Sequence, residues 1–239
     1  MGRMACFGKE NGGRPLRGWT ARLDQVIQAG QVMNEPLLWY FADPMCSWCW
    51  GFSPVIEAVR DEFHDRMKIA LVLGGLRPGE TAPMTAAGRE EILHHWRQVH
   101  ERTGQPFRFD GALPEGFVYD TEPASRAVVT VGGIEPESIF AMFRAIQSAF
   151  YAAGRDVTQP EVLADLAAGL GVTPARFLPV FDSDAARART QAHFRQARQA
   201  EVRGFPTLIL QRGGQLERIT DGWKPRAEVC AMIAARLAG

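Results

Sequence analysis

Two cysteines in one short segment are the residues of this chain best suited to chemistry. The segment FADPMCSWCWGF, residues 41–52, separates Cys46 from Cys49 by only Ser47 and Trp48. Such a pair can bind a metal ion, form a structural disulfide, or exchange electrons as a dithiol. Which chemistry applies depends on the elements that position the two sulfurs.

The surrounding pattern places the pair where a strand passes into a helix. The apolar run PLLWYFAD ends at Pro44 and predicts a buried strand. From Cys46 onward, apolar residues recur at helical spacing. The sulfur of Cys46 should therefore lie near the unpaired N–H groups of a helix start, where a thiolate is favoured. We predict Cys46 as the nucleophile and Cys49, one turn further on, as its buried resolving partner.

A metal site is less favoured by the ligand types. Structural zinc needs four ligands, and the chain has no second close cysteine pair. His94, His95 and His100 share one helical stretch, but their spacing does not match a second half-site. We predict no metal and no cofactor, apart from a redox-active disulfide between Cys46 and Cys49.

Composition argues against several partners and compartments. The 239-residue chain has 27 basic and 27 acidic residues, which favours neither nucleic acid nor an anionic membrane as a partner. No apolar run reaches transmembrane length. Residues 1–33 are expected to be a polar extension with a short helix around Trp19 and Leu23, and they do not resemble a signal peptide. A cytoplasmic location is therefore expected, with Cys6 and Cys230 as incidental thiols.

The order of elements is strand, helix, strand, then a helical block, then two strands and a helix. The run KIALVLGGL predicts the second strand, parallel to the first. Gly213-Gly214 predicts the turn of a closing hairpin. Thr158 and Glu161 have the spacing of a capping box. The resulting boundaries are 34–76 with 200–239 for the α/β domain and 77–199 for an inserted helical domain.

The motif RGFPT precedes the third predicted strand. Proline at a strand's first residue removes one ladder donor. A cis bond between Phe205 and Pro206 would bring the Phe205 backbone beside Cys46, with groups free to pair with an extended peptide.

Together these segments resemble a known family. FADPMCSWCWGF, the helical block and GFPTLIL before a ββα tail look like the DsbA family of thioredoxin-fold oxidoreductases. DPMCSWCWGFSP followed by GGL is similar to its cytoplasmic FrnE-like members, known as predicted protein-disulfide isomerases. The resemblance implies an α/β, thioredoxin-like fold (βαβ…ββα) with a large all-helical insertion. It also implies thiol–disulfide exchange at Cys46 and Cys49, a cis Pro206, and a substrate-facing loop at Phe205 and Pro206.

The chain departs from the family's pattern in two respects. Ser47 and Trp48 stand where strong oxidants of the family carry a histidine between the cysteines. Tyr40 occupies the position, six residues before the first cysteine, that often holds a buried carboxylate. Proton transfer at Cys49 must then use water or another group, for which Asp43 is the candidate. Trp48 is expected to be exposed and to contact substrate.

The leading hypothesis is a thiol–disulfide oxidoreductase or isomerase acting on protein or small-molecule thiols and disulfides, with glutathione a candidate co-substrate. The alternative is a glutathione-dependent isomerase or transferase of the 2-hydroxychromene-2-carboxylate isomerase type, whose members use a serine near the helix start. A third hypothesis is a non-enzymatic adaptor whose helical block binds a partner.

Overall fold

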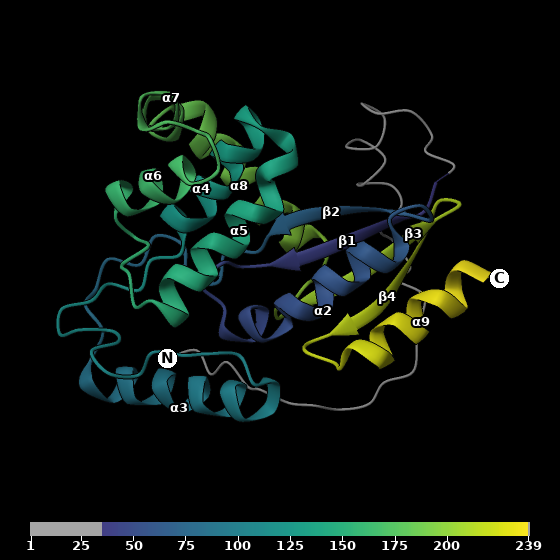
Figure 1. The fold of residues 1–239 in the computed structure, drawn as a ribbon, viewed down its shortest axis with the longest axis horizontal. Helices are drawn as coiled ribbons and strands as arrows, with labels where there is room; N and C mark the ends of the chain where they lie inside the picture. Colours follow the sequence, from purple (N-terminus) through teal and green to yellow (C-terminus); the bar gives the residue numbers. More distant parts are fainter. Residues whose placement is uncertain (1–34, 239) are drawn as a thin grey trace.

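The computed structural model describes residues 35–238, which contain a four-stranded mixed sheet of order β2-β1-β3-β4 (Figure 1). β1 pairs in parallel with β2 and antiparallel with β3, and β3 pairs antiparallel with β4. The predicted strands and their parallel pair are confirmed. The expected extension 1–33, its short helix and Cys6 lie outside the described residues. The strands are β1 (Leu37–Ala42), β2 (Lys68–Leu73), β3 (Thr207–Arg212) and β4 (Gln215–Asp221).

Helices fill the interval between β2 and β3, as the predicted α/β fold with a helical insertion requires. The boundaries 34–76, 77–199 and 200–239 stay predictions. The helical segments are α2 (Ser47–Phe63), α3 (Ala86–Thr103), α4 (Glu122–Ile134), η1 (Pro136–Ser138), α5 (Ile139–Gln147), η2 (Ser148–Ala152), α6 (Pro160–Ala168), α7 (Pro174–Phe181), α8 (Asp184–Gln199) and α9 (Arg226–Ala238).

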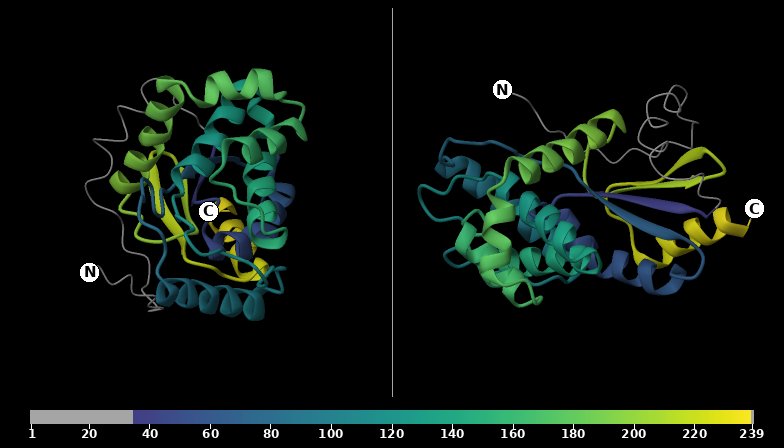
Figure 2. Two further views of the ribbon diagram at one scale, coloured as in Figure 1. Left: turned by 90° about the vertical axis from the view of Figure 1, so that its left-hand side faces the viewer. Right: turned by 90° about the horizontal axis from the view of Figure 1, so that it is seen from above.

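The sheet is covered on both faces. Seen from above in Figure 2, α8 lies on one face, and α2 and α9 lie on the other. The apolar side chains of β1 are buried on both faces for the same reason; Tyr40 and Phe41 point to opposite sides, and both are almost fully covered. This arrangement holds the start of α2 at the end of β1.

Helix α2 continues through Pro54, which lacks the N–H that would pair with the carbonyl of Trp50. That carbonyl instead accepts hydrogen bonds from Ser53 Oγ at 2.8 Å and from Gln105 Nε2 at 3.2 Å. The helix therefore continues past Pro54 without an unsatisfied buried carbonyl at this point.

Three local features differ from the sequence-based expectations. α4 and α7 were not predicted as separate helices. α4 carries several β-branched residues and two glycines, and it is buried almost all round, so no amphipathic period marks it. The capping box at Thr158 is wrong, because Gln159 is the N-cap of α6 and the Thr158 hydroxyl donates to Asp156 Oδ1 at 2.6 Å.

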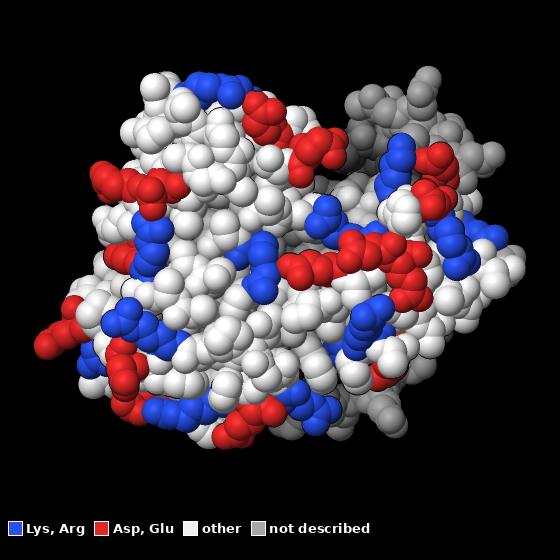
Figure 3. All heavy atoms as spheres, in the orientation of Figure 1, with Lys and Arg blue, Asp and Glu red and all other residues white. Residues whose placement is uncertain are grey.

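Charges of both signs are interspersed over the face of the molecule that Figure 3 shows. Within residues 35–238, none of the helices combines the length and apolar character needed to span a bilayer.

Candidate functional site

Cys46 is the N-cap of α2, immediately after the β1–α2 turn. Its backbone is extended, with φ −95° and ψ 117°, and its carbonyl accepts the N–H of Trp50 at 3.0 Å. The predicted transition from strand to helix at Cys46 is thus confirmed. Both Cys46 and Cys49 are free thiols, Cys46 with 7% of its surface exposed and Cys49 with none. Cys46 is therefore the cysteine that a substrate can reach.

The sulfur of Cys46 faces the loop before β3 rather than the helix backbone. No helix N–H hydrogen-bonds to it as a side-chain cap. Its thiol instead donates to the Phe205 carbonyl at 3.6 Å. The Phe205–Pro206 peptide bond is cis, as the resemblance implied. Cys46 and Phe205, which are 159 positions apart in the chain, are thus in direct contact.

Gly74, directly after β2, allows this loop to approach. A Cβ at Gly74 would lie 2.0 Å from Cζ of the Phe205 ring, so a larger residue would displace the ring from its place. The absence of a side chain at Gly74 thus lets the loop that carries Pro206 pack closely against the end of β2.

Cys49 lies beneath Cys46, in an apolar environment. Burial raises the pKa of Cys49 well above its usual range. The hydrogen bond with Cys46, and the negative charge that Cys46 carries when it is ionised, act in the same direction. A proton must therefore leave Cys49 before it can act as a nucleophile. Tyr40 is the neighbouring hydroxyl group, and burial together with the charge of Cys49 raises its pKa as well.

Asp43 is a buried carboxylate between β1 and α2. Its Oδ1 accepts the N–H of Met45 at 2.9 Å, and its Oδ2 accepts the N–H of Leu76 at 2.8 Å. Burial raises its pKa from 3.8 to about 6, although these backbone hydrogen bonds act in the opposite direction. Asp43 thus joins the cysteine turn to the segment after β2, and its charge adds to the elevation of the Cys49 pKa.

Replacing Asp43 with asparagine should change how stability depends on pH. A carboxyl pKa that is higher in the folded state favours folding at low pH, and this contribution is lost as the pH rises from about 4 through about 6. A pKa raised from 3.8 to about 6 corresponds to roughly 3 kcal/mol. The free energy of unfolding of Asp43→Asn, minus that of wild type, should therefore increase by about that amount between pH 3 and 7. Urea unfolding at several pH values measures it, and a pH-independent difference would contradict the assignment.

The two tryptophans around Cys49 occupy different environments. Trp50 is 1% exposed, and its Nε1 donates to the Pro106 carbonyl at 2.9 Å. Trp48 is half-buried beside the cysteines. Only Trp48 is thus placed where a bound substrate could touch it.

One residue of the site carried no sequence signal. The hydroxyl of Tyr119 donates to the Met45 carbonyl at 2.6 Å, which fixes the turn before Cys46 from 74 residues away. Tyr119 sits in a loop without a motif, so only the folded chain brings it to the cysteine turn. Among residues 35–238, no three histidine, cysteine or carboxylate side chains converge in the manner of metal ligands.

Comparison with known proteins identifies the fold around this site. Residues 38–226 match the DSBA-like thioredoxin domain family. A crystal structure from Nitrosomonas europaea, described as a candidate protein disulfide isomerase, is 48% identical, with a TM-score of 0.81 over 85% of this chain and 98% of that one. The cytosolic disulfide reductase DsbM from Pseudomonas aeruginosa is 29% identical, with a TM-score of 0.71 over 84% and 98%. DsbM has also been solved with glutathione, and that structure gives a TM-score of 0.70 at 29% identity over 85% and 100%.

The curated relatives are more distant. The ClpXP adapter protein SpxH from Halalkalibacterium halodurans is 23% identical over 75% of this chain, and that from Shouchella clausii 20% identical over 74%. The chain spans only 60% and 58% of the lengths of these two relatives.

Proposed function

Because the chain belongs to the DSBA-like thioredoxin domain family, we propose that it is a thiol–disulfide oxidoreductase and that Cys46 and Cys49 are its exchanging pair. The observation that carries this proposal is the position of Cys46: slightly exposed at the start of α2, against the Phe205 carbonyl, with Cys49 fully buried behind it. Cys46, Trp48, Phe205 and Pro206 would form the substrate-facing surface.

The proposed reaction reduces a substrate disulfide in two exchanges. The Cys46 thiolate attacks one substrate sulfur, forms a mixed disulfide and releases the other sulfur as a thiolate that takes up a proton. Cys49 then loses its proton and attacks Cys46 Sγ. This step forms the Cys46–Cys49 disulfide and releases the second substrate thiolate. The substrate has gained two electrons, and a thiol donor returns the protein to its dithiol form.

We propose glutathione as that donor and the cytoplasm as the location. The glutathione-bound structure of the cytosolic reductase DsbM supports both, since that structure is 29% identical and covers 85% of this chain. In a reducing compartment, a donor of this class would keep the pair in the dithiol form.

Trapping with glutathione disulfide tests the proposal. Cys49→Ala should retain one glutathionyl group on Cys46, seen as an increase in protein mass, because no thiol remains to release it. Wild type should accumulate no such adduct and should turn over a model disulfide with glutathione. Cys46→Ala is the matched control and should form no adduct. An unmodified Cys49→Ala protein and an inactive wild type would reject the proposal.

The adaptor hypothesis is the second candidate, and the names of the two curated relatives support it. It differs from the first in one measurable respect, because an adaptor needs no turnover. A protein that binds its partner equally well as Cys46→Ala and Cys49→Ala, and that exchanges no model disulfide, would favour it. The isomerase alternative instead predicts turnover that survives loss of Cys49.

A further inference from the structure

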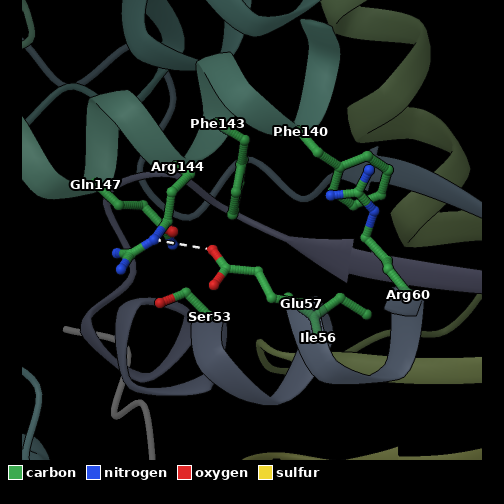
Figure 4. A pocket seen from close by; sticks show the side chains of 8 residues that line it. All are labelled: Ser53, Ile56, Glu57, Arg60, Phe140, Phe143, Arg144 and Gln147. Carbon is green, nitrogen blue, oxygen red and sulfur yellow. Dashed lines mark ion pairs between the residues drawn. The ribbon is translucent and has the colours of Figure 1, made fainter. Parts of the chain in front are cut away.

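A small cavity with both polar and apolar walls lies between α2 and α5 (Figure 4). Its volume is about 20 Å³, which suits a single water molecule. Ser53 and Glu57 reach it from α2, whereas Arg144 and Gln147 reach it from α5. Polar side chains on two elements thus converge on a space the size of a water.

Gln147 is the strongest sign that the cavity binds something. The side chain is fully buried, and neither its amide oxygen nor its amide nitrogen has a hydrogen-bond partner among the described residues. Nη1 of Arg144 is also buried without a partner there. Leaving buried polar groups unpaired costs about 1–3 kcal/mol each. A water molecule in the cavity would supply an acceptor for the donors and a donor for the amide oxygen.

The cavity lies on the same helical face as Cys49. Cys49, Ser53 and Glu57 follow one another at intervals of four residues along α2, so their side chains share one stripe of the helix. Glu57 is about half exposed and forms an ion pair with Arg144, with Nε 3.0 Å from Oε1. The stripe therefore runs from a buried thiol to a carboxylate in contact with solvent.

Tyr40 of β1 lies beside the thiol and packs against one residue of the cavity wall. Its ring packs edge-on against Phe143 of the cavity wall, at 6.0 Å between centroids, and against Phe52 of α2 at 5.9 Å. Its hydroxyl is buried beside the Cys49 thiol and has no other hydrogen-bond partner among residues 35–238. Burial raises its pKa, and the charges of Cys49, Cys46 and, as the smallest cause, Glu57 act in the same direction.

We propose that this cavity is the proton exit of the buried thiol: Tyr40 passes the Cys49 proton to a water held by Gln147 and Ser53, and Glu57 transfers it to solvent. The inference rests on the proposed role of Cys49 as the resolving cysteine. As Cys49 attacks Cys46 Sγ, its proton moves to the Tyr40 oxygen while the Tyr40 proton moves to the water. The water passes a proton to the Glu57 carboxylate, which releases it. Proton number and charge are conserved, and Tyr40 ends as it began.

Other ionisable groups face the same path and must be distinguished. Asp43 lies near Cys49, but both of its oxygens accept backbone N–H groups. Arg60 also lines the cavity, with its guanidinium 4.2 Å above the Phe140 ring. Arg144 pairs with Glu57 and keeps its carboxylate at the cavity.

A chromogenic aromatic disulfide separates the two chemical steps. Attack by Cys46 releases the first coloured thiolate, and resolution by Cys49 releases the second. Tyr40→Phe and Glu57→Gln should each slow the second phase by about tenfold or more, and leave the first within about twofold, because only the second needs a proton to leave Cys49. The double variant should be no slower than the slower single variant. Glu62→Gln, the same change on the same helix outside the cavity, should alter neither phase.

Two readouts distinguish the relay from structural damage. In Tyr40→Phe and Glu57→Gln the second phase should accelerate about tenfold per pH unit, because it then depends on the thiolate fraction of Cys49, whereas wild type should vary much less. Gln147→Leu should slow the second phase without loss of stability, since it removes an unpaired buried amide.

Two outcomes would overturn the relay: normal second phases in Tyr40→Phe and Glu57→Gln, or a slow second phase confined to Asp43→Asn. Failure of the proposed function looks different, because wild type would then release no second thiolate, or Cys49→Ala would release it at the wild-type rate.

Discussion

Replacing Cys46 with serine should lower the rate of disulfide exchange by at least about a thousandfold. A serine hydroxyl is ionised far less than a thiol at neutral pH and forms no disulfide. The change is also small in volume, so the hydrogen bond to the Phe205 carbonyl can persist and the fold should be kept. Reduction of a model disulfide with glutathione as donor measures the effect.

Cys230→Ser is the matched control for this experiment. Cys230 is a mostly buried thiol on α9, beside Glu62 and Arg226 rather than the cysteine turn. It should retain the wild-type rate within about twofold. Equal losses in both variants would mean that the assay reports stability rather than nucleophilic attack. Survival of disulfide reduction in Cys46→Ser would instead mean that another thiol carries the exchange.

Replacing Trp50 with alanine should lower the free energy of unfolding by about 4 kcal/mol. The indole is almost fully buried, stacks on Tyr151 at 6.1 Å between centroids, and lies under the Arg144 guanidinium at 4.2 Å. Truncation would remove these contacts and leave the Pro106 carbonyl without its donor. Urea unfolding at constant slope measures the loss.

Trp48→Ala tests the other tryptophan of the same motif. Because Trp48 is half-buried, its truncation should lower stability by less than about 1 kcal/mol. If Trp48 contacts substrate, as we propose, the variant should raise KM for a protein disulfide more than for glutathione disulfide, which offers less surface to an aromatic side chain. A larger loss of stability for Trp48→Ala than for Trp50→Ala would contradict the assigned environments.

Local patterns were sufficient for the elements around the cysteines. Pro44 and the apolar run before it predict the end of β1, and helical spacing predicts α2 from Cys46 onward. The Gly213-Gly214 turn is equally local, because both residues adopt positive φ values of 53° and 77°. In each case the determining residues lie within a few positions of one another.

Sequence patterns did not predict elements whose structure depends on packing against distant parts of the chain or on competing hydrogen bonds. Helix α4 is enclosed by other elements on nearly every side, so it lacks the polar face by which a helix is recognised. Thr158 has the right spacing for a cap, but its hydroxyl donates a hydrogen bond to Asp156 instead. Helix α6 therefore begins at Pro160, with Gln159 as its N-cap.

The sequence by itself determined that Cys46 starts a helix one turn before Cys49, because strand and helix periods are properties of neighbouring residues. The tertiary structure alone decided what surrounds the two sulfurs. It set the Phe205 carbonyl against Cys46, Asp43 against Leu76, and Gln147 beside the stripe that begins at Cys49. These partners are tens of residues or more apart in the chain. Pairing of β1 with β3 and with β2 brings the first two together, and packing of α5 on α2 brings the third.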